Sequence, residues 1–481
     1  MTTADTQTAS NGVPARQKIV VVNPATEQTI AEVPCHPATE VEEAINLART
    51  AFETWSIAPA MERAALLLDF ARRLRDSVAS LAQELVAEGG KSIVEAETEI
   101  TWVADTFEYN AGLARQRAGL IAPANTHDSM DLVVKTPVGV VAAILPWNFP
   151  LLLWAWKAAP ALAAGNCVIA KPSPETPLSL LKVQELLALP EGVHQIVNGF
   201  GDIGAQLVNS RKVDMVAFTG TSETGVKIME SCARQSKRVL AEMSGNDPFI
   251  VWSDVDIETA VEAVAFAAFA NAGQVCTSAE RIYVANEIYD TFAQALAKRV
   301  SSLRVGDPAD PKTDIGPLAT SAHRARVEEY VRRACSSGAM LLTGGKALDR
   351  PGYYFAPTVL RDVSHEFLTE VGEWFGPVAP LVRVHSFEEA LRLANDSPYG
   401  LGANVLTQDL TRAMTATRDL RFGTVWVNDP LMDNNAAPFG GFRRSGMGRE
   451  LGEEGFDAFL ETKHVALSFA LRMQPWWFNQ R

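Results

Sequence analysis

The sequence predicts an α/β protein with two Rossmann-like domains, each built around a parallel sheet, and a small β extension. Short apolar runs alternate with helical periods in the middle of the chain, and a second series of this kind begins near Pro248. Strands that alternate with helices form βαβ units and a parallel sheet. At about 150 residues per domain, the 481 residues accommodate both domains and the extension.

The first domain combines short apolar strands with amphipathic helices. Ligands of such sheets bind at the carboxyl ends of the strands, so the residues that follow each strand are the candidates for function. The expected strands are VGVVAAIL (138–145), NCVIAK (166–171), VHQIVNG (193–199), MVAFTG (215–220) and RVLAEMS (238–244), with helices over 151–164, 177–187, 202–209 and 222–231.

The second domain begins after a boundary near Gly245. A long apolar helix over 254–273 is opened by capping aspartates and closed by a glycine. The expected strands are FIVW (249–252), RIYVA (281–285), GYYFAPTVL (352–360), VAPLVRV (378–384), LGANVLT (401–407) and GTVWVND (423–429), with helices over 287–302, 320–336 and 386–395.

Two further apolar segments predict an oligomer. Residues 120–137 form a separate hairpin pattern, and TKHVALSFALRM (462–473) is an apolar strand near the C-terminus. Exposed strands of this kind pair with another chain, which favours a homodimer or a homotetramer. The alternative is that both strands cover their own domain.

Composition restricts the partners. The net charge of −14 and the pI of about 5.1 argue against nucleic acid and against anionic membranes. The longest uncharged run, 136–156, is interrupted by prolines, so we expect a buried strand, loop and helix rather than a membrane span. Five cysteines without regular spacing favour a reducing cytoplasm, and the seven scattered histidines predict no metal site.

The segment NAGQVCTSAER (271–281) places one cysteine, Cys276, in a short turn before an expected strand. A thiolate there would be a strong nucleophile, although most cysteines are small buried apolar residues. The four residues on either side include no His, Lys or Arg, so any proton acceptor must come from elsewhere. A thiol hydrolase with a distant histidine stays open.

Two glycine-rich turns are candidates for binding a dinucleotide phosphate. GFGDIG (199–204) matches the G-x-G-x-x-G pattern, but the acidic residue expected about 20 residues later is not at the end of a strand. FTGTSETG (218–225) is the better candidate, because free amides at a helix N-terminus bind anions. An ordinary capped helix would have the same residues.

Four polar residues stand at strand or loop ends. The prolines of PWNFP (146–150) would hold Asn148 rigidly as an oxyanion donor, or it merely forms a turn. Lys171 could bind ribose or phosphate, or lie at the surface. Glu242 follows apolar residues, so burial should raise its pKa toward that of a general base, unless it forms a structural ion pair. Glu373 precedes an aromatic–Gly–Pro turn, or is a charge at a helix end.

Taken together, PWNFP, FTGTSETG, EMSG, GQVC, EWFGPV and PFGGFRRSG occur in the order and approximate spacing of the aldehyde dehydrogenase superfamily, which the chain resembles from Asn23 to Gly452. The resemblance implies the aldehyde dehydrogenase-like fold. The implied divisions are a disordered tail (1–17), a cofactor-binding domain (18–119 and 138–244), a catalytic domain (245–445) and oligomerisation strands (120–137 and 460–481).

The resemblance also implies the roles of single residues. Cys276 would attack the aldehyde and form a thiohemiacetal, whose oxyanion would be held by Asn148 and the Cys276 backbone N–H. Hydride transfer to nicotinamide would leave a thioester, which Glu242 would help water to hydrolyse. The cofactor-binding residues would be Leu145, Pro146, Trp147, Lys171, Ser173, Glu175, Gly204, Phe218, Gly220, Thr221, Gly225, Met243, Glu373 and Phe375.

Two departures from the family pattern bear on the cofactor. The ribose carboxylate commonly lies three positions after the lysine, where this chain has Pro174, and Glu175 comes one position later. Because such a carboxylate favours NAD over NADP, we expect NAD as the main cofactor with NADP possible. Ser244 replaces a glycine after Glu242, and we expect little chemical consequence from it.

The substrate is expected to be an uncharged aldehyde of small to medium size, because Asp433 at the tunnel mouth would repel a carboxylate. The implied tunnel residues are Phe149, Leu152, Leu153, Trp156, Val275, Thr277, Asp433 and Phe439. The alternatives are a CoA-acylating semialdehyde dehydrogenase, against which Glu242 argues, a non-catalytic member of the fold, and a thiol hydrolase without a cofactor.

Overall fold

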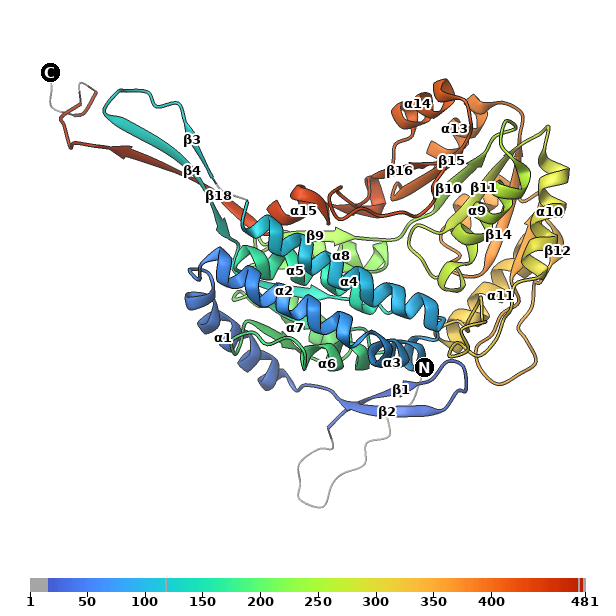
Figure 1. The fold of residues 1–481 in the computed structure, drawn as a ribbon, viewed down its shortest axis with the longest axis horizontal. Helices are drawn as coiled ribbons and strands as arrows, with labels where there is room; N and C mark the ends of the chain where they lie inside the picture. The colour runs from blue at the N-terminus through green and yellow to red at the C-terminus, as the bar shows by residue number, and fades with distance from the viewer. Residues whose placement is uncertain (1–15, 117–118, 475, 479–481) are drawn as a thin grey trace, which may run out of the picture.

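Two sheets, each covered by helices, form the body of the molecule, and a narrow β extension projects from it (Figure 1). The computed structural model describes residues 16–116, 119–474 and 476–478. Most of the expected disordered tail lies outside these residues. Its last two residues are ordered, because Arg16 donates to the Cys35 carbonyl and the Gln17 carbonyl accepts from the Cys35 N–H. Within the described chain, no helix is long and apolar enough to cross a membrane.

The N-terminal segment packs a hairpin and a layer of helices against the first sheet. Their apolar residues recur at helical spacing, and α4 begins with a capping box formed by Ser92 and Glu95. The elements are β1 (Lys18–Val22), β2 (Thr29–Pro34), α1 (Ala38–Trp55), α2 (Ala60–Asp76), α3 (Val78–Gly89) and α4 (Ile93–Ala114).

The first sheet has six strands in the order β17-β9-β8-β5-β6-β7, and all of its pairings except β17 with β9 are parallel. Every residue of α5 is buried, as expected for the long uncharged run. The elements are β5 (Val140–Ile144), α5 (Pro150–Ala164), β6 (Cys167–Lys171), α6 (Leu178–Gln184), β7 (His194–Ile196), α7 (Gly201–Asn209), β8 (Met215–Thr219), α8 (Ser222–Ala233) and β9 (Arg238–Glu242).

The second sheet has seven strands in the order β12-β13-β14-β11-β10-β15-β16, with β12 as an antiparallel edge. The elements are β10 (Asp247–Val251), α9 (Ile257–Phe269), β11 (Ala279–Ala285), α10 (Tyr289–Ser301), α11 (Ser321–Ser336), β12 (Met340–Thr343), β13 (Thr358–Arg361), α12 (His365–Val371), β14 (Val378–Val384), α13 (Phe387–Asn395), β15 (Gly402–Leu406), α14 (Leu410–Asp419) and β16 (Thr424–Val427).

The second domain differs from the prediction in one strand and one helix, and it also contains β12, α12 and α14, which the sequence had not indicated. The expected strand 352–360 is extended only at its end, because Gly352 lies at positive φ and Pro357 cannot donate to a ladder. The expected helix 254–273 ends at Phe269, because Asn271 and Ala272 adopt left-handed backbone conformations. The break matters for the site, since Cys276 follows it.

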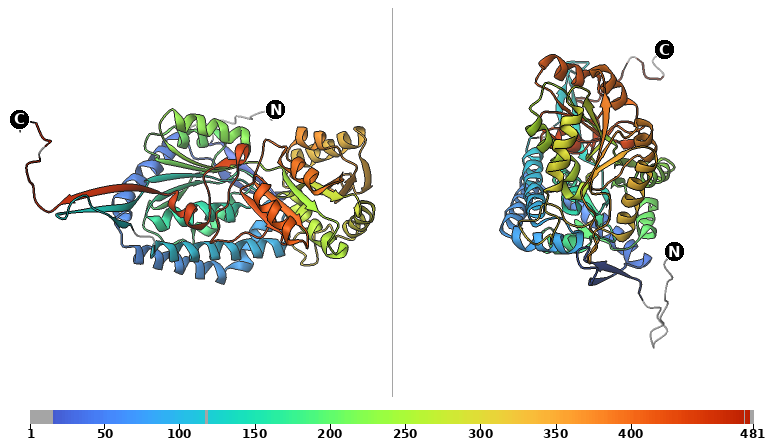
Figure 2. Two further views of the ribbon diagram at one scale, coloured as in Figure 1. Left: turned by 90° about the horizontal axis from the view of Figure 1, so that it is seen from above. Right: turned by 90° about the vertical axis from the view of Figure 1, so that its right-hand side faces the viewer.

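The chain finally returns to the first half of the molecule. Gly446 and Met447 (β17) pair with β9, followed by α15 (Gly452–Asp457) and β18 (Leu460–Ser468). β18 pairs along its whole length with β4 (Ser129–Pro137), which also pairs with β3 (Leu120–Ala122). These strands form the three-stranded sheet that extends away from the body (Figure 2).

Candidate active site

The carboxyl ends of the first sheet and the turn before β11 meet around one cavity of about 380 Å³. β5 leads into the PWNFP turn, β8 into the start of α8, and β9 ends at Glu242. The sequence-predicted residues that line this cavity are Pro146, Trp147, Asn148, Gly220, Thr221, Glu242, Met243, Cys276, Glu373 and Phe375.

Cys276 follows a turn of unusual backbone geometry. Asn271 and Ala272 have φ values of 50° and 56°, and Gly273 also lies at positive φ. Non-glycine residues rarely adopt this conformation without support from their surroundings. The turn lifts the half-buried thiol into the cavity, where burial and the nearby carboxyl groups of Glu242, Asp247 and Asp433 raise its pKa well above the usual value.

Asn148 is buried, and its side-chain amide is fixed by the Cys276 turn. Nδ2 donates to the Gln274 carbonyl at 3.1 Å. A side-chain amide carries two N–H groups, so one is left to point at a ligand. Asn148 can therefore hold the turn and still offer an N–H to the cavity.

Glu242 is buried, and neither carboxyl oxygen has a partner at hydrogen-bonding geometry among the described residues. Burial and, to a smaller extent, the charge of Glu450 raise its pKa to about 8. The Lys157 ammonium and the nearby Thr219 and Cys276 side chains act in the opposite direction. Among the described residues, no arginine pairs with Glu242, so the alternative of a structural ion pair does not apply.

A buried charge cluster lies behind Glu242. Lys157 is fully buried and donates to Glu450 Oε1 at 2.7 Å and to Thr219 Oγ1 at 2.6 Å. The other oxygen of Glu450 has no partner among the described residues. This ion pair was not expected from the sequence. Lys157 lies in the apolar helix α5 and Glu450 ends the distant RRSGMGRE segment, and no sequence signal connects the two.

The start of α8 has room for a phosphate group. A Cβ atom on Gly220 would lie 2.7 Å from the Phe218 ring, and one on Gly225 would lie 2.1 Å from Met243 Sδ. Glycine is thus required at both positions for the helix to approach the β8–β9 edge. Thr221 caps the helix, because its hydroxyl accepts the Thr224 N–H at 3.4 Å, and Gly220, Thr221 and Ser222 at this capped start also line the cavity, where a helix N-terminus can face an anion.

Glu373 and Phe375 lie across the cavity on a fixed loop. Glu373 Oε1 accepts from the Gly245 N–H at 3.4 Å, and burial raises its pKa to about 7. The Ser244 side chain acts to lower the pKa of Glu373. Our expectation that Ser244 has little chemical consequence stays a prediction. Arg326 of α11, Tyr399 before β15 and Arg444 also line the cavity, and of these only Arg444 lies in one of the sequence motifs, PFGGFRRSG.

The remaining cofactor candidates form a group at the end of β6. Lys171 is buried, packs on Gly204 and donates from Nζ to the Pro172 carbonyl at 3.1 Å. The Ser173 hydroxyl donates to the Glu175 carboxylate, which keeps that carboxylate near the lysine despite its shift by one position. Leu145 is buried, and its backbone N–H donates to the Lys171 carbonyl at 3.0 Å.

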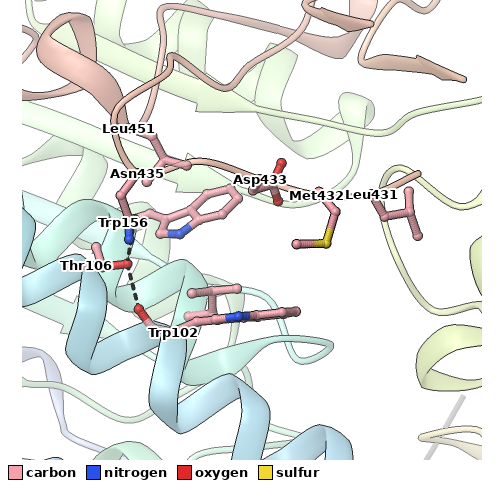
Figure 3. Close-up of a pocket in the computed structure, with 9 residues that line it drawn as sticks. Trp102, Thr106, Trp156, Leu431, Met432, Asp433, Asn435 and Leu451 are labelled. Atoms are coloured by element: carbon pink, nitrogen blue, oxygen red, sulfur yellow. Dashed lines mark hydrogen bonds between the residues drawn. The ribbon is translucent and has the colours of Figure 1, made fainter. Parts of the chain in front are cut away.

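A smaller cavity of about 60 Å³ contains part of the expected substrate tunnel (Figure 3). Leu152 and Trp156 of α5 line it, and Phe439 packs against the Trp156 ring at 4.9 Å between centroids. Asp433 keeps an exposed surface here, although surrounding protein raises its pKa to about 7; the exposure favours its charged form. Leu431 and Met432, beside Asp433 in the same loop, also line it, and the residues not expected in this lining are Trp102, Thr106, Asn435 and Leu451.

The other tunnel candidates lie elsewhere in the described structure. Leu153 and Thr277 are buried, and Val275 is half-buried in the turn before the nucleophile. Phe149 lies beneath the Lys91 ammonium, which is 4.0 Å from the ring centroid. Trp102 could have been suspected as an apolar residue on an exposed face of α4, where it is 41% exposed.

A thiol, an unpartnered carboxyl and a glycine-lined helix start at the junction of two parallel sheets define a dinucleotide-dependent oxidoreductase that works through a cysteine. The family model "Aldehyde dehydrogenase family" matches residues 13–465. The chain belongs to the aldehyde dehydrogenase family.

Similar proteins support both cofactors. The chain is 38% identical to the succinate-semialdehyde dehydrogenase [NADP(+)] of Escherichia coli over 95% of each chain. It is 39% identical to the lactaldehyde dehydrogenase of the same organism, over 93% of this chain and 95% of that one. A crystal structure of betaine aldehyde dehydrogenase from Staphylococcus aureus with NAD+ superimposes with a TM-score of 0.93 at 36% identity, over 96% of this chain and 93% of that one.

The pKa of Glu242 gives a testable prediction. In the cofactor-free protein, its carboxyl infrared band should disappear with a midpoint near pH 8. Glu450→Gln removes the charge that raises this pKa and leaves that of Lys157, which lowers it, so the midpoint should move to lower pH. Difference spectra against Glu242→Gln isolate the band. The exposed Glu32→Gln is the control. An unchanged titration midpoint in Glu450→Gln would contradict the electrostatic coupling between Glu450 and Glu242.

Proposed function

We propose that this chain oxidises an aldehyde to a carboxylic acid with NAD(P)+, using Cys276 as nucleophile, Asn148 as oxyanion donor and Glu242 as general base. The observation that carries the proposal is that these three side chains line one cavity and that the carboxyl of Glu242 is buried without a partner. A buried unpartnered carboxyl needs a functional explanation, and proton transfer with the adjacent thiol and water is one.

In the first half of the reaction, the Cys276 thiolate adds to the carbonyl carbon of the aldehyde. Glu242 accepts the thiol proton, since its raised pKa brings it closer to that of the thiol. The free N–H of Asn148 and the Cys276 backbone N–H then hold the thiohemiacetal oxygen. Bound NAD(P)+ supplies the hydride acceptor and a positive charge near the thiol. Loss of hydride from the thiohemiacetal carbon leaves a thioester on Cys276.

Glu242 first releases the thiol proton to solvent. In the second half, it takes a proton from a water molecule, which attacks the thioester carbon and expels the Cys276 sulfur, and this proton then returns to that sulfur. The carboxylic acid leaves, and the thiol is restored. The charge of Lys157 lowers the pKa of Glu242, while the charge of Glu450 raises it. The balance, together with burial, leaves this pKa at about 8, close to neutral pH. The presence of Glu242 beside the thiol supports hydrolysis over transfer to CoA.

Cys276→Ala should abolish aldehyde-dependent NAD(P)H formation, with a loss of at least about 10³-fold in kcat, because the covalent step cannot occur. Glu242→Gln should slow the first turnover of NAD(P)H, because Glu242 accepts the thiol proton, and should lose steady-state turnover, which also needs Glu242 to activate water. Absorbance of NAD(P)H is measured with each cofactor, and a preference above about 10³-fold for either would contradict use of both.

The matched control is Cys335→Ala, which removes the other half-buried thiol, on α11. Oxidation at the wild-type rate by Cys276→Ala would refute the proposed nucleophile.

We propose an uncharged aldehyde of small to medium size as the substrate. The described lining of the small cavity contains no Lys, Arg or His that could bind a carboxylate, and it contains the carboxyl of Asp433. Trp102, Leu152 and Trp156 offer apolar surface instead. The named relatives act on different aldehydes at nearly equal identity, so they do not decide the substrate.

The wild-type protein should prefer butanal over succinic semialdehyde in kcat/KM, and the preference should increase as the pH rises through about 7, where Asp433 ionises. Asp433→Asn should raise kcat/KM for succinic semialdehyde roughly tenfold and leave that for butanal unchanged. Asp429→Asn, outside the cavity, is the control. A wild-type preference for succinic semialdehyde would overturn this assignment.

We further propose that the extension formed by β3, β4 and β18 joins copies of this chain into a dimer or tetramer. All nine residues of β4 are only half-buried, and a sheet that projects from the body without a core of its own is marginal in water. Large apolar side chains are exposed on it, including Leu120, Ile121 and Phe469.

Truncation after Phe459 should yield a smaller assembly in light scattering coupled to gel filtration, because β4 loses its paired strand. Leu120→Ser with Ile121→Ser is a milder variant that keeps β18 in place. A wild-type protein that is monomeric at micromolar concentration would refute the proposal.

A further inference from the structure

A buried ion pair outside the cavity holds the turn that carries Asn148. Lys91 and Glu99, just before and within α4, are almost completely buried and bonded to each other. Lys91 Nζ also donates to the Asn148 carbonyl at 2.8 Å. Glu99 Oε1 accepts the N–H groups of Leu151 and Leu152, both at 3.0 Å. The pair therefore fixes the middle of the PWNFP turn and the residues that directly follow it.

The same part of α4 holds the turn before the nucleophile. Glu95 Oε1 accepts the N–H of Asn271, the first left-handed residue, at 2.6 Å. Asn271 Nδ2 lies 3.2 Å from both the Asn148 and the Gln274 carbonyls. Asn148 Nδ2 donates to that same Gln274 carbonyl. The donor amide and the nucleophile turn are thus bonded to each other and to one helix.

We propose that Lys91 and Glu99 are positioning residues for the oxyanion donor, acting through the backbone of Asn148. This inference rests on the proposed role of Asn148. A buried ion pair is weak evidence for stability, since an apolar pair often replaces it at little cost. Its charged bonds are directional, however, and a displacement of about 1 Å at a catalytic group costs roughly 100-fold in rate.

The test is a double-mutant cycle between Lys91→Met and Asn148→Ala, read as the single-turnover rate of NAD(P)H formation. Lys91→Met should lower this rate roughly 100-fold in the wild-type background and less than about threefold in the Asn148→Ala background. Glu99→Gln should have a weaker effect of the same kind, because its amide oxygen still accepts from Leu151 and Leu152. Should Lys91→Met fail to fold, Glu99→Gln carries the cycle. The surface variant Lys182→Met is the control.

A second readout separates positioning from general damage. Alkylation of Cys276 by iodoacetamide needs the thiol but no oxyanion donor, so its rate should be unchanged in Lys91→Met. Equal losses in alkylation and in NAD(P)H formation, or losses that simply multiply in the cycle, would overturn the inference. An Asn148→Ala variant with the wild-type rate would instead refute the proposed oxyanion role, and the positioning role with it.

Discussion

The crowding of acidic groups around one thiol is the constraint on which the site depends. Glu242 and Asp247 are buried and Glu373 is half-buried near Cys276, and each raises the pKa of the thiol. Burial in turn raises the pKa of each carboxyl, so the cavity by itself favours neutral groups. The reaction therefore requires positive charge and hydrogen-bond donors from groups other than the thiol and these carboxyls. The proposed site obtains them from the cofactor, from Asn148 and, through Glu242, from Lys157.

The fold meets this constraint by placing the carboxyl ends of the first sheet against the amino ends of strands in the second sheet. The first sheet contributes Asn148 and Glu242 on short, rigid connections, and the second contributes Cys276 from a left-handed turn before β11. Glu280 reinforces the opposite wall, because its carboxylate accepts the backbone N–H groups of Trp374 and Phe375. Phe375 itself lies at a φ of 54°, and the His323 ring donates to its carbonyl. Buried side chains thus hold the strained backbone on both sides of the cavity.

The strands and the central residues could be predicted from the sequence because their signals are local. Runs such as VVAAI and CVIAK are apolar on both faces, and Cys276, Asn148 and Glu242 stand at the ends of such runs or in motifs. The supporting residues could not be predicted in this way. Lys157 and Glu450 are 293 residues apart, and Lys91 reaches a backbone carbonyl 57 residues away. Such contacts depend on tertiary packing, which no periodicity or turn signal encodes.

The route of the chain between the two sheets has a mechanical consequence. The chain passes from the first sheet to the second after β9 and returns before β17, and these two connecting segments are hydrogen-bonded to each other. The Met243 N–H donates to the Ser445 carbonyl at 2.9 Å, and the Ser445 hydroxyl donates to the Ser244 carbonyl at 2.8 Å. A paired ribbon bends in one plane but resists twisting and sliding. Opening of the cleft for cofactor exchange would therefore follow a single axis, and the two halves would close again with the thiol facing the same amide.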